Sequence, residues 1–439
     1  MLRRTFIALA AMAALAGCGG EPEQASAPAA PALRADVAAP SVVGEWVMPV
    51  LQPGSASADL TSTPDGRLLM SWINSQRGRR HILQFSSYDP GLQRWMHAPT
   101  TIAVGNSMFV NWADTPHIVS ANDGALWAHW LQKNAEAPYA YDVVLSRSRD
   151  GGSNWSPPQI PYDDRSETEH GFVSMWPQGD NGIGMAWLDG RNTKPAATSG
   201  PAGDTAQGEH AAHAGAMTLR ATVLDGQLQR SGDAELDAMT CDCCQTDVAA
   251  TAQGALLVYR GRTRDEIRDI LVTRFDGKAW TPPLRVHADD WKMPACPVNG
   301  PAIAAQGDAA VVAWYTVAGD TPLVRIALSR DAGATFAPPV ELDRGEAVQG
   351  RVDVALDSQQ AWILWVRERD GQQSLWLSRR SLDLAQEYER IELAQLKGTG
   401  RGTGFPKLAV HGGIAHVLFT DVVDGVAGLR GLRVLPATP

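Results

Sequence analysis

Leu-Leu-Met-Ser-Trp, residues 68–72, is the first of seven short apolar segments that each end on a large aromatic residue. The other six end at Trp130, Trp187, Tyr259, Trp314, Trp365 and Phe419, at intervals of 51 to 72 residues. A repeat of this length, with four β-like segments in each unit, is typical of the blades of a β-propeller. The chain contains 15 Trp but only 8 Phe, and a high content of large aromatic residues is typical of an all-β fold.

The strands at the two ends of the repeat determine the number of blades. The first unit offers four strands, at residues 58–63, 68–73, 82–88 and 100–104, whereas the last offers three, at 407–410, 415–419 and 428–435. Residues 45–51 form a β-like segment without a partner in its own neighbourhood. Pairing this segment with the last three strands closes the ring and removes an open sheet edge. We therefore expect one domain, residues 42–437, with seven four-stranded blades, and six blades as the alternative.

The first forty residues have the pattern of an export signal and a tether. Arg3 and Arg4 precede the apolar run 6–16, which is too short to span a bilayer but has the length of a signal-peptide core. The run ends in Leu-Ala-Gly-Cys18, which resembles the signal of bacterial lipoproteins. The resemblance implies a signal peptide at residues 1–17, lipidation of Cys18, and an Ala/Pro-rich tether at 18–41. It also implies anchoring in the bacterial cell envelope, at an outer membrane, facing the periplasm or the cell surface.

A second repeated pattern, S-x-D-x-G-x-x-aromatic, follows the third strand of two blades. Its two copies contain Asp150, Gly152 and Trp155, and Asp331, Gly333 and Phe336. The Asp caps backbone N–H groups of a tight turn, the Gly supplies an unusual φ, and the aromatic ring fixes the hairpin to its blade. These copies resemble the Asp-box (BNR) repeats of the sialidase superfamily. The resemblance implies a structural role for both turns, on the face opposite the active site.

Cysteines are concentrated in the segments that lead into the innermost strands. Because strands alternate in direction, these segments of all blades open onto one mouth of the channel. Cys241, Cys243 and Cys244 precede the fourth blade, and Cys296 precedes the fifth. Outside the cytoplasm four thiols can pair as two disulfides. They can also bind Cu(I) or Zn(II), with His170 or the His210/His213 pair completing the coordination, or form a redox-active pair.

The same mouth receives acidic and basic candidates for catalysis. The acidic candidates are Asp114, Glu169 and Asp247, and the basic ones are Arg191, Arg260, Arg351 and Arg401. Resemblance to the sialidases implies an arginine triad that clamps a substrate carboxylate, an Asp acid/base, and a Tyr nucleophile activated by a Glu. The four arginines are our candidates for the clamp, and the three acidic residues for the acid/base chemistry.

Three functions follow from these patterns. We favour a lipid-anchored, non-hydrolytic propeller whose mouth holds a Cys/His site for a metal or another ligand. The alternatives are a sialidase-like exo-glycosidase that acts on anionic glycans, and an interaction scaffold with structural disulfides. The expected partners are an anionic small molecule, a glycan or an envelope protein, with the membrane reached through the lipid anchor. The net charge of −10 and the lack of a basic stripe argue against nucleic acid.

Overall fold

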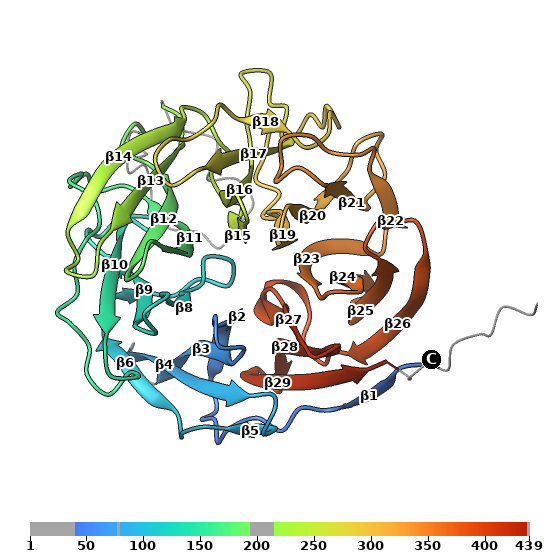
Figure 1. Ribbon diagram of the computed structural model, residues 1–439, viewed down its shortest axis with the longest axis horizontal. Coiled ribbons are helices and arrows are strands. Elements are labelled where there is room, and N and C mark those ends of the chain that lie inside the picture. Colours follow the sequence, from blue (N-terminus) through green and yellow to red (C-terminus); the bar gives the residue numbers. More distant parts are fainter. Residues whose placement is uncertain (1–39, 77–79, 194–214, 437–439) are drawn as a thin grey trace, which may run out of the picture. The chain divides into compact units, whose positions relative to one another are not determined.

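Seven β-sheets surround a central channel in the computed structural model, which describes residues 40–76, 80–193 and 215–436 (Figure 1). The prediction of a seven-bladed propeller is therefore confirmed. Cys18, His210 and His213 lie outside the described residues. Within the described part of the chain, no helix has the length and apolar character needed to cross a membrane.

The strands follow the chain blade by blade. Blade 1 contains β2 (Ser55–Ser62), β3 (Leu68–Gln76), β4 (Arg80–Asp89), β5 (Arg94–Trp95) and β6 (Thr100–Gly105). Blade 2 contains β7 (Met108–Phe109), β8 (Ile118–Ser120), β9 (Leu126–Lys133) and β10 (Tyr141–Ser148). Blade 3 contains β11 (His170–Gln178), β12 (Gly182–Asp189), β13 (Thr218–Leu224) and β14 (Arg230–Asp237). Blade 4 contains β15 (Asp247–Thr251), β16 (Gly254–Arg260), β17 (Ile270–Phe275) and β18 (Leu284–Arg285).

The remaining blades have the same four-part order. Blade 5 contains β19 (Ala302–Gln306), β20 (Ala309–Thr316), β21 (Leu323–Ser329) and β22 (Val340–Arg344). Blade 6 contains β23 (Val348–Leu356), β24 (Gln360–Arg369), β25 (Gln372–Ser381) and β26 (Glu387–Gln395). Blade 7 contains β27 (Lys407–His411), β28 (Ile414–Val423), β29 (Val426–Leu435) and β1 (Val42–Glu45), and a short 3-10 helix, η2 (Gly400–Thr403), precedes it.

The ring is closed by the N-terminal strand, as expected, but at a different position. β1 pairs antiparallel with β29, with Val42 opposite Leu435, so that the blue and red ends of the chain lie side by side (Figure 1). The prediction that this strand covers residues 45–51 is wrong, because only Glu45 of that segment belongs to β1. Beyond it, Trp46 turns inward and stacks on Trp95, with ring centroids 5.2 Å apart, and Pro49 has no N–H to donate to a ladder.

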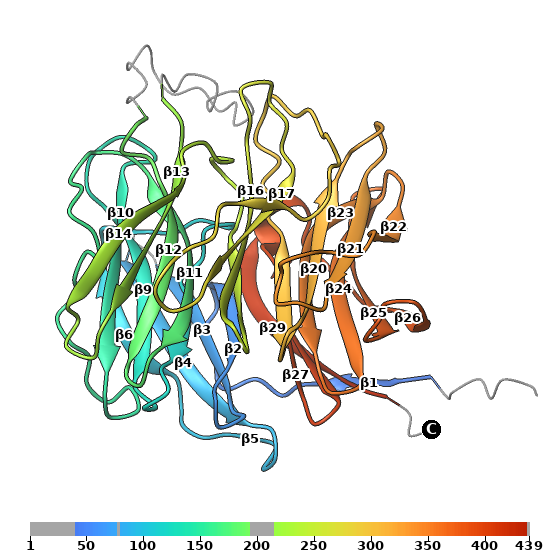
Figure 2. The same cartoon turned by 45° about the horizontal axis from the view of Figure 1, so that its top comes forward.

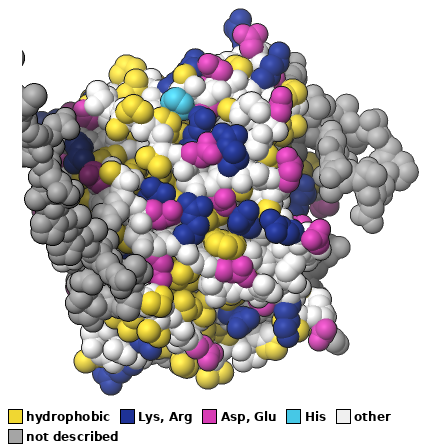
Figure 3. All heavy atoms as spheres, turned by 90° about the vertical axis from the view of Figure 1, so that its right-hand side faces the viewer, with side chains coloured by type: hydrophobic (Ala, Val, Ile, Leu, Met, Phe, Trp, Pro, Cys, Tyr) yellow, Lys and Arg dark blue, Asp and Glu magenta, His cyan; other side chains and the backbone are white. Residues whose placement is uncertain are grey.

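The hydrophobic core lies between the faces of neighbouring blades, which stand side by side around the ring (Figure 2). All seven repeated aromatic residues are buried in these interfaces. The outer face of blades 5 to 7 is different, because acidic and basic side chains are mixed over it (Figure 3). Ion pairs such as Arg344–Glu341 on β22 and Arg390–Glu387 on β26 account for part of this mixture.

Both S-x-D-x-G turns have the same internal hydrogen bonds. Asp150 Oδ1 accepts the backbone N–H of Asn154 at 2.9 Å, and Ser148 Oγ accepts that of Gly152 at 2.9 Å. The corresponding bonds of the second turn, around Asp331 and Ser329, are both 2.8 Å long. Gly152, with φ +89°, packs so tightly on blade 1 that a Cβ atom would lie 2.2 Å from Cζ of Phe85. The first turn therefore holds blade 2 against blade 1.

Gly152 and Gly151 form a matched pair that tests this contact. Both have positive φ, at +89° and +69°, but a Cβ on Gly151 would meet no atom within 4 Å. We expect Gly152→Ala to lower the free energy of unfolding by about 1–3 kcal/mol more than Gly151→Ala, because only the former overpacks the interface. Urea unfolding of the two variants measures the difference. Equal losses would show that φ strain alone matters at this turn.

Candidate functional site

One mouth of the channel is capped by side chains from four blades. The segment before β8, which reaches toward the ring centre in Figure 1, carries Trp112, and this ring stacks on Phe405 of blade 7 at 5.5 Å. The guanidinium of Arg351 from blade 6 lies over Trp112 at 5.1 Å. Gln245 of blade 4 donates its Nε2 hydrogen to the carbonyl of Ala113 at 2.9 Å. The cap joins the segments that carry most of the predicted site residues.

Three thiols lie together beside this cap. Cys241 and Cys244 stand at the two ends of a turn that precedes β15, and their Sγ atoms are 3.1 Å apart. The Sγ of Cys243 is 3.9 Å from that of Cys241, and all three sulfurs lie within 4.8 Å of one another. The three side chains are 1%, 5% and 2% exposed, in sequence order. The local sequence Cys-Asp-Cys-Cys thus folds into a buried three-sulfur cluster.

The fourth thiol comes from the neighbouring blade. Cys296 lies in the segment before β19, is half-buried, and packs against the same hydrophobic cluster as the other three. Burial raises the pKa of Cys243 well above its ordinary value, and its neighbouring thiols, Cys241, Cys244 and Cys296, add to the rise. All four described cysteines are free thiols. The structure therefore brings together four thiols from blades 4 and 5.

Positive charge next to the cluster favours a thiolate at Cys241. The Nη1 of Arg268 donates to Cys241 Sγ at 3.2 Å. Burial alone would raise the pKa of Cys241, but hydrogen bonds from Cys243 and Cys244 and the charge of Arg268 together hold it well below its ordinary value. For Cys243 and Cys244 burial dominates, and their pKa values are raised. The cluster therefore carries one negative charge most easily at Cys241.

Salt bridges surround the cluster. Arg268 pairs with Glu266 at 2.8 Å, and Arg262 pairs with Asp242, which lies within the cysteine motif, at 3.1 Å.

His170, the predicted additional metal ligand, lies away from the thiols, in blade 3. Its Nε2 is 2.9 Å from Asp164, and its ring stacks on Tyr162 with centroids 4.7 Å apart. Among the described residues, the group of potential metal-ligand atoms contains the three cysteines of blade 4 and not His170.

Two of the acidic candidates meet at a buried tyrosine. The hydroxyl of Tyr141 lies 2.7 Å from Glu169 Oε1 and 3.1 Å from Asp114 Oδ2, and Asp114 Oδ1 also accepts the backbone N–H of Phe172 at 2.8 Å. Burial raises the pKa of Asp114 to about 7 and the pKa of Glu169 to about 8. The Tyr141 hydroxyl has a single hydrogen, which it can donate to only one of the two carboxyl groups. A proton on one of these carboxyl groups is therefore favoured, because it supplies the second contact with a hydrogen.

The four candidate arginines do not converge on one point. Arg260 is 2% exposed and donates to the backbone carbonyls of Asn299, Arg268 and Tyr315 at 2.7 to 3.0 Å. Arg351 donates to Thr403 Oγ1 and to the carbonyls of Gly400 and Gly404 at 2.9 to 3.1 Å.

The other two arginines are also engaged separately. Arg191 pairs with Asp189 at 2.7 Å and with Asp233 at 3.5 Å. Arg401 is exposed and lies over the ring of Trp112 at 5.7 Å. Of the four, Arg401 is thus the guanidinium most available to an anion in solution.

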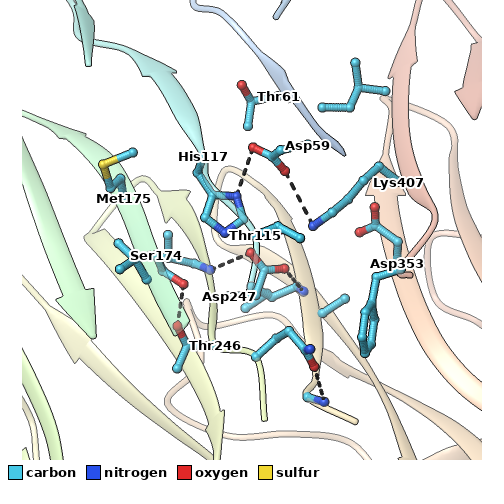
Figure 4. A pocket seen from close by; sticks show the side chains of 18 of the residues that line it. Asp59, Thr61, Thr115, His117, Ser174, Met175, Thr246, Asp247, Asp353 and Lys407 are labelled. Atoms are coloured by element: carbon cyan, nitrogen blue, oxygen red, sulfur yellow. Dashed lines mark hydrogen bonds and ion pairs between the residues drawn. The ribbon is translucent and has the colours of Figure 1, made fainter. Parts of the chain in front are cut away.

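A polar cavity of about 330 Å³ lies in the channel beneath the cap (Figure 4). Its wall contains Asp247, whose Oδ2 accepts the backbone N–H of Ile303 at 2.8 Å and whose pKa is raised by burial. Asp59 pairs with His117 at 2.9 Å and with Lys407 at 3.5 Å. Burial raises the pKa of Asp353, another wall residue, to about 7.

Sequence reasoning missed Asp59, Asp353 and Lys407. A signal was available for one of them, because Asp-Val-Ala occurs at both 247–249 and 353–355. Both copies lie in innermost strands, so the repeat itself marks an inward-facing position. Asp59 and Lys407 lack such a repeat, and only the closed ring brings them together.

Glu169 should make stability depend on pH. Because burial raises its pKa in the folded protein from an ordinary value near 4.5 to about 8, its favourable contribution is complete at low pH and is lost as pH rises through this interval. We expect Glu169→Gln to flatten the fall in unfolding free energy between pH 5 and 8, by up to about 1.4 kcal/mol per pH unit. Glu167→Gln, an exposed neighbour, is the matched control, and denaturant unfolding across this range is the measurement. An unchanged slope in Glu169→Gln would mean that Glu169 is ionised at neutral pH.

No family model and no curated protein matches the chain. Among solved structures, a protein of unknown function from Dyadobacter fermentans has a TM-score of 0.52 and 12% identity, covering 91% of this chain and 98% of that one. A mutant of NanB sialidase from Streptococcus pneumoniae has a TM-score of 0.45 and 9% identity, over 84% and 83% of the two chains. An alpha-L-arabinanase from Penicillium chrysogenum has a TM-score of 0.44 and 13% identity, over 91% and 98%. At these identities the similarities concern the propeller fold alone.

Proposed function

We propose that the protein binds a soft metal ion, Cu(I) or Zn(II), through Cys241, Cys243, Cys244 and Cys296. The observation that carries this proposal is the buried cluster of three sulfurs, with a fourth thiol, Cys296, in the hydrophobic cluster packed around it. Thiolates are the protein ligands that Cu(I) and Zn(II) prefer. A tetrahedral Zn(II) site with Zn–S bonds of about 2.3 Å has sulfurs about 3.8 Å apart. The Cys241–Cys244 and Cys241–Cys243 separations, 3.1 and 3.9 Å, lie on either side of that value.

The surroundings of the thiols support this function. A site with several thiolates is anionic, and Arg268 beside Cys241 offsets part of that charge. The salt bridges of Arg262 and Arg268 hold the loop of blade 4 in place around the cluster. Because the thiols are ordered before an ion binds, less conformational entropy is lost on binding.

The site belongs, in this proposal, to a lipid-anchored protein of the bacterial cell envelope. The tether would hold the propeller near a membrane, and exposed Arg401 beside Trp112 would attract an anionic small molecule, glycan or envelope protein to the mouth. Sialidase-like hydrolysis receives less support from the geometry. The Tyr141, Glu169 and Asp114 group has the residue types that such chemistry uses, but Tyr141 is only 1% exposed.

Metal titration with matched variants tests the proposal. The reduced full chain should bind one Cu(I) or Zn(II) ion, measured by competition with a chromophoric chelator and by elemental analysis. We expect Cys243→Ser and Cys296→Ser to weaken binding by about 100-fold or more, and acid to weaken it as the thiols are protonated. His170→Asn is the control, and it should leave the affinity unchanged because His170 is bonded to Asp164. Binding of neither ion by the reduced protein would refute the function.

The anchor has a separate test. Cys18→Ser should leave the protein unprocessed or release it from the membrane fraction, because the serine cannot be lipidated. Membrane fractionation and the mass of the mature N-terminus measure this. Wild-type fractionation and processing of the variant would remove the lipoprotein assignment without affecting the metal site.

A further inference from the structure

The four thiols differ in how close they are to one another. Cys241 and Cys244 have the shortest separation, 3.1 Å between Sγ atoms, and they occupy the first and last positions of a tight turn. The Cα atoms at these positions of a turn lie within about 7 Å, which is compatible with a disulfide. Cys243 and Cys244 are consecutive in the chain, and this arrangement is unfavourable for a disulfide between them. Cys241 and Cys244 are therefore the pair best placed to be oxidised together.

The thiols also differ in how easily a reagent reaches them. Cys241, Cys243 and Cys244 are buried, whereas Cys296 is half-buried. Cys296 in turn packs against the hydrophobic cluster that contains the other three cysteines, and within that cluster Cys243 Sγ lies 3.9 Å from Cys241 Sγ. The contacts thus form a continuous path of sulfurs from Cys296, the outermost thiol, to the Cys241–Cys244 pair.

We propose that these cysteines form a thiol–disulfide relay, in which Cys296 reacts with a small disulfide in solution and the oxidation is passed through Cys243 to the Cys241–Cys244 pair. The relay gates the metal site, and this gating rests on the metal-binding function proposed above. Metal binding and oxidation exclude each other, because both use the same thiolates. The oxidised protein has lost two of the four ligands and does not hold the ion, and a bound ion slows oxidation.

The steps balance with a low-molecular-weight disulfide as the oxidant. Cys296 thiolate attacks one sulfur of the oxidant. A mixed disulfide forms between Cys296 and one half of the oxidant, the S–S bond of the oxidant breaks, and the other half leaves as a thiol. Cys243 then attacks the Cys296 sulfur and releases the second thiol, which leaves a Cys243–Cys296 disulfide. Each exchange is an attack of a thiolate on a disulfide sulfur.

Two internal exchanges complete the relay. Cys241 attacks the Cys243 sulfur and returns Cys296 to a thiol, and Cys244 attacks the Cys241 sulfur and returns Cys243 to a thiol. One oxidant disulfide is reduced to two thiols, the pair loses two electrons, and the two protons of the pair end on the released thiols. The first internal attack is made by Cys241, whose Sγ lies 3.9 Å from that of Cys243.

Disulfide mapping tests the relay. The reduced, metal-free full chain is treated with oxidised glutathione, quenched with acid at intervals, and digested for mass spectrometry. The wild type should accumulate a Cys241–Cys244 disulfide. Cys241→Ser should stop at Cys243–Cys296, and Cys296→Ser should slow oxidation of the pair at least about tenfold because the path to solvent is broken. Oxidation of Cys296→Ser at the wild-type rate, or accumulation of a different final disulfide in the wild type, would overturn the relay.

A second measurement covers the case in which Cys296→Ser does not fold. Brief alkylation of the folded, reduced wild type should modify Cys296 before the other three thiols, and the alkylated protein should show the same slowed oxidation. Preferential alkylation of a blade-4 cysteine would overturn the proposal.

Metal titration of the reduced and oxidised forms distinguishes a failure of metal binding from a failure of the relay. If a Cys241–Cys244 disulfide forms but the reduced protein binds no ion, the metal function fails and the relay stands; if the reduced protein binds the ion but no such disulfide forms, the relay fails.

Discussion

A ring of side-chain contacts around the channel ties each blade to the next, and the position of every mouth loop depends on it. Each contact uses a polar side chain on an innermost strand or just before it. In ring order the contacts are Asp59–His117, Asp114 to the N–H of Phe172, Thr246 to the carbonyl of Phe172, Asp247 to the N–H of Ile303, Asn299 to the N–H of Arg351, Asp353 to the N–H of Leu408, and Lys407–Asp59. Because buried polar groups are costly unless they are bonded, these contacts favour one arrangement of the seven blades.

The ring explains what the acidic residues near the channel do. Asp114 and Asp247 have the residue type and the position expected for acid/base chemistry, yet each accepts a backbone N–H from the following blade. A carboxyl group is suited to this role because its oxygens accept hydrogen bonds whether the group is ionised or protonated. The same burial that makes these bonds strong also raises the pKa values of both groups. A raised pKa at this channel is therefore a consequence of fold closure.

The sequence predicts the fold better than it predicts the site. Seven aromatic-ended strands at regular intervals and a spare N-terminal strand require a closed ring, because each blade must bury both faces. The alternation of strand direction also predicts that Cys241 and Cys296 face one mouth. It does not predict that the guanidinium groups of Arg260 and Arg351 donate hydrogen bonds to backbone carbonyls, or that His170 pairs with Asp164. Those outcomes depend on the paths of loops, which repeats do not determine.

Arg260 connects the ring of contacts around the channel to the thiols. Its position explains why the thiols of blades 4 and 5 lie close together. Its guanidinium donates to the carbonyls of Asn299 and Tyr315 in blade 5, and stacks on Trp291 at 5.0 Å, so it holds both ends of the segment that carries Cys296. Its own carbonyl accepts the N–H of Cys241 at 3.1 Å. One buried residue thereby fixes the blade-4 turn and the blade-5 segment relative to each other. Because a ligand set positioned before binding loses little entropy, the rigidity of this joint favours metal coordination and sulfur-to-sulfur exchange alike.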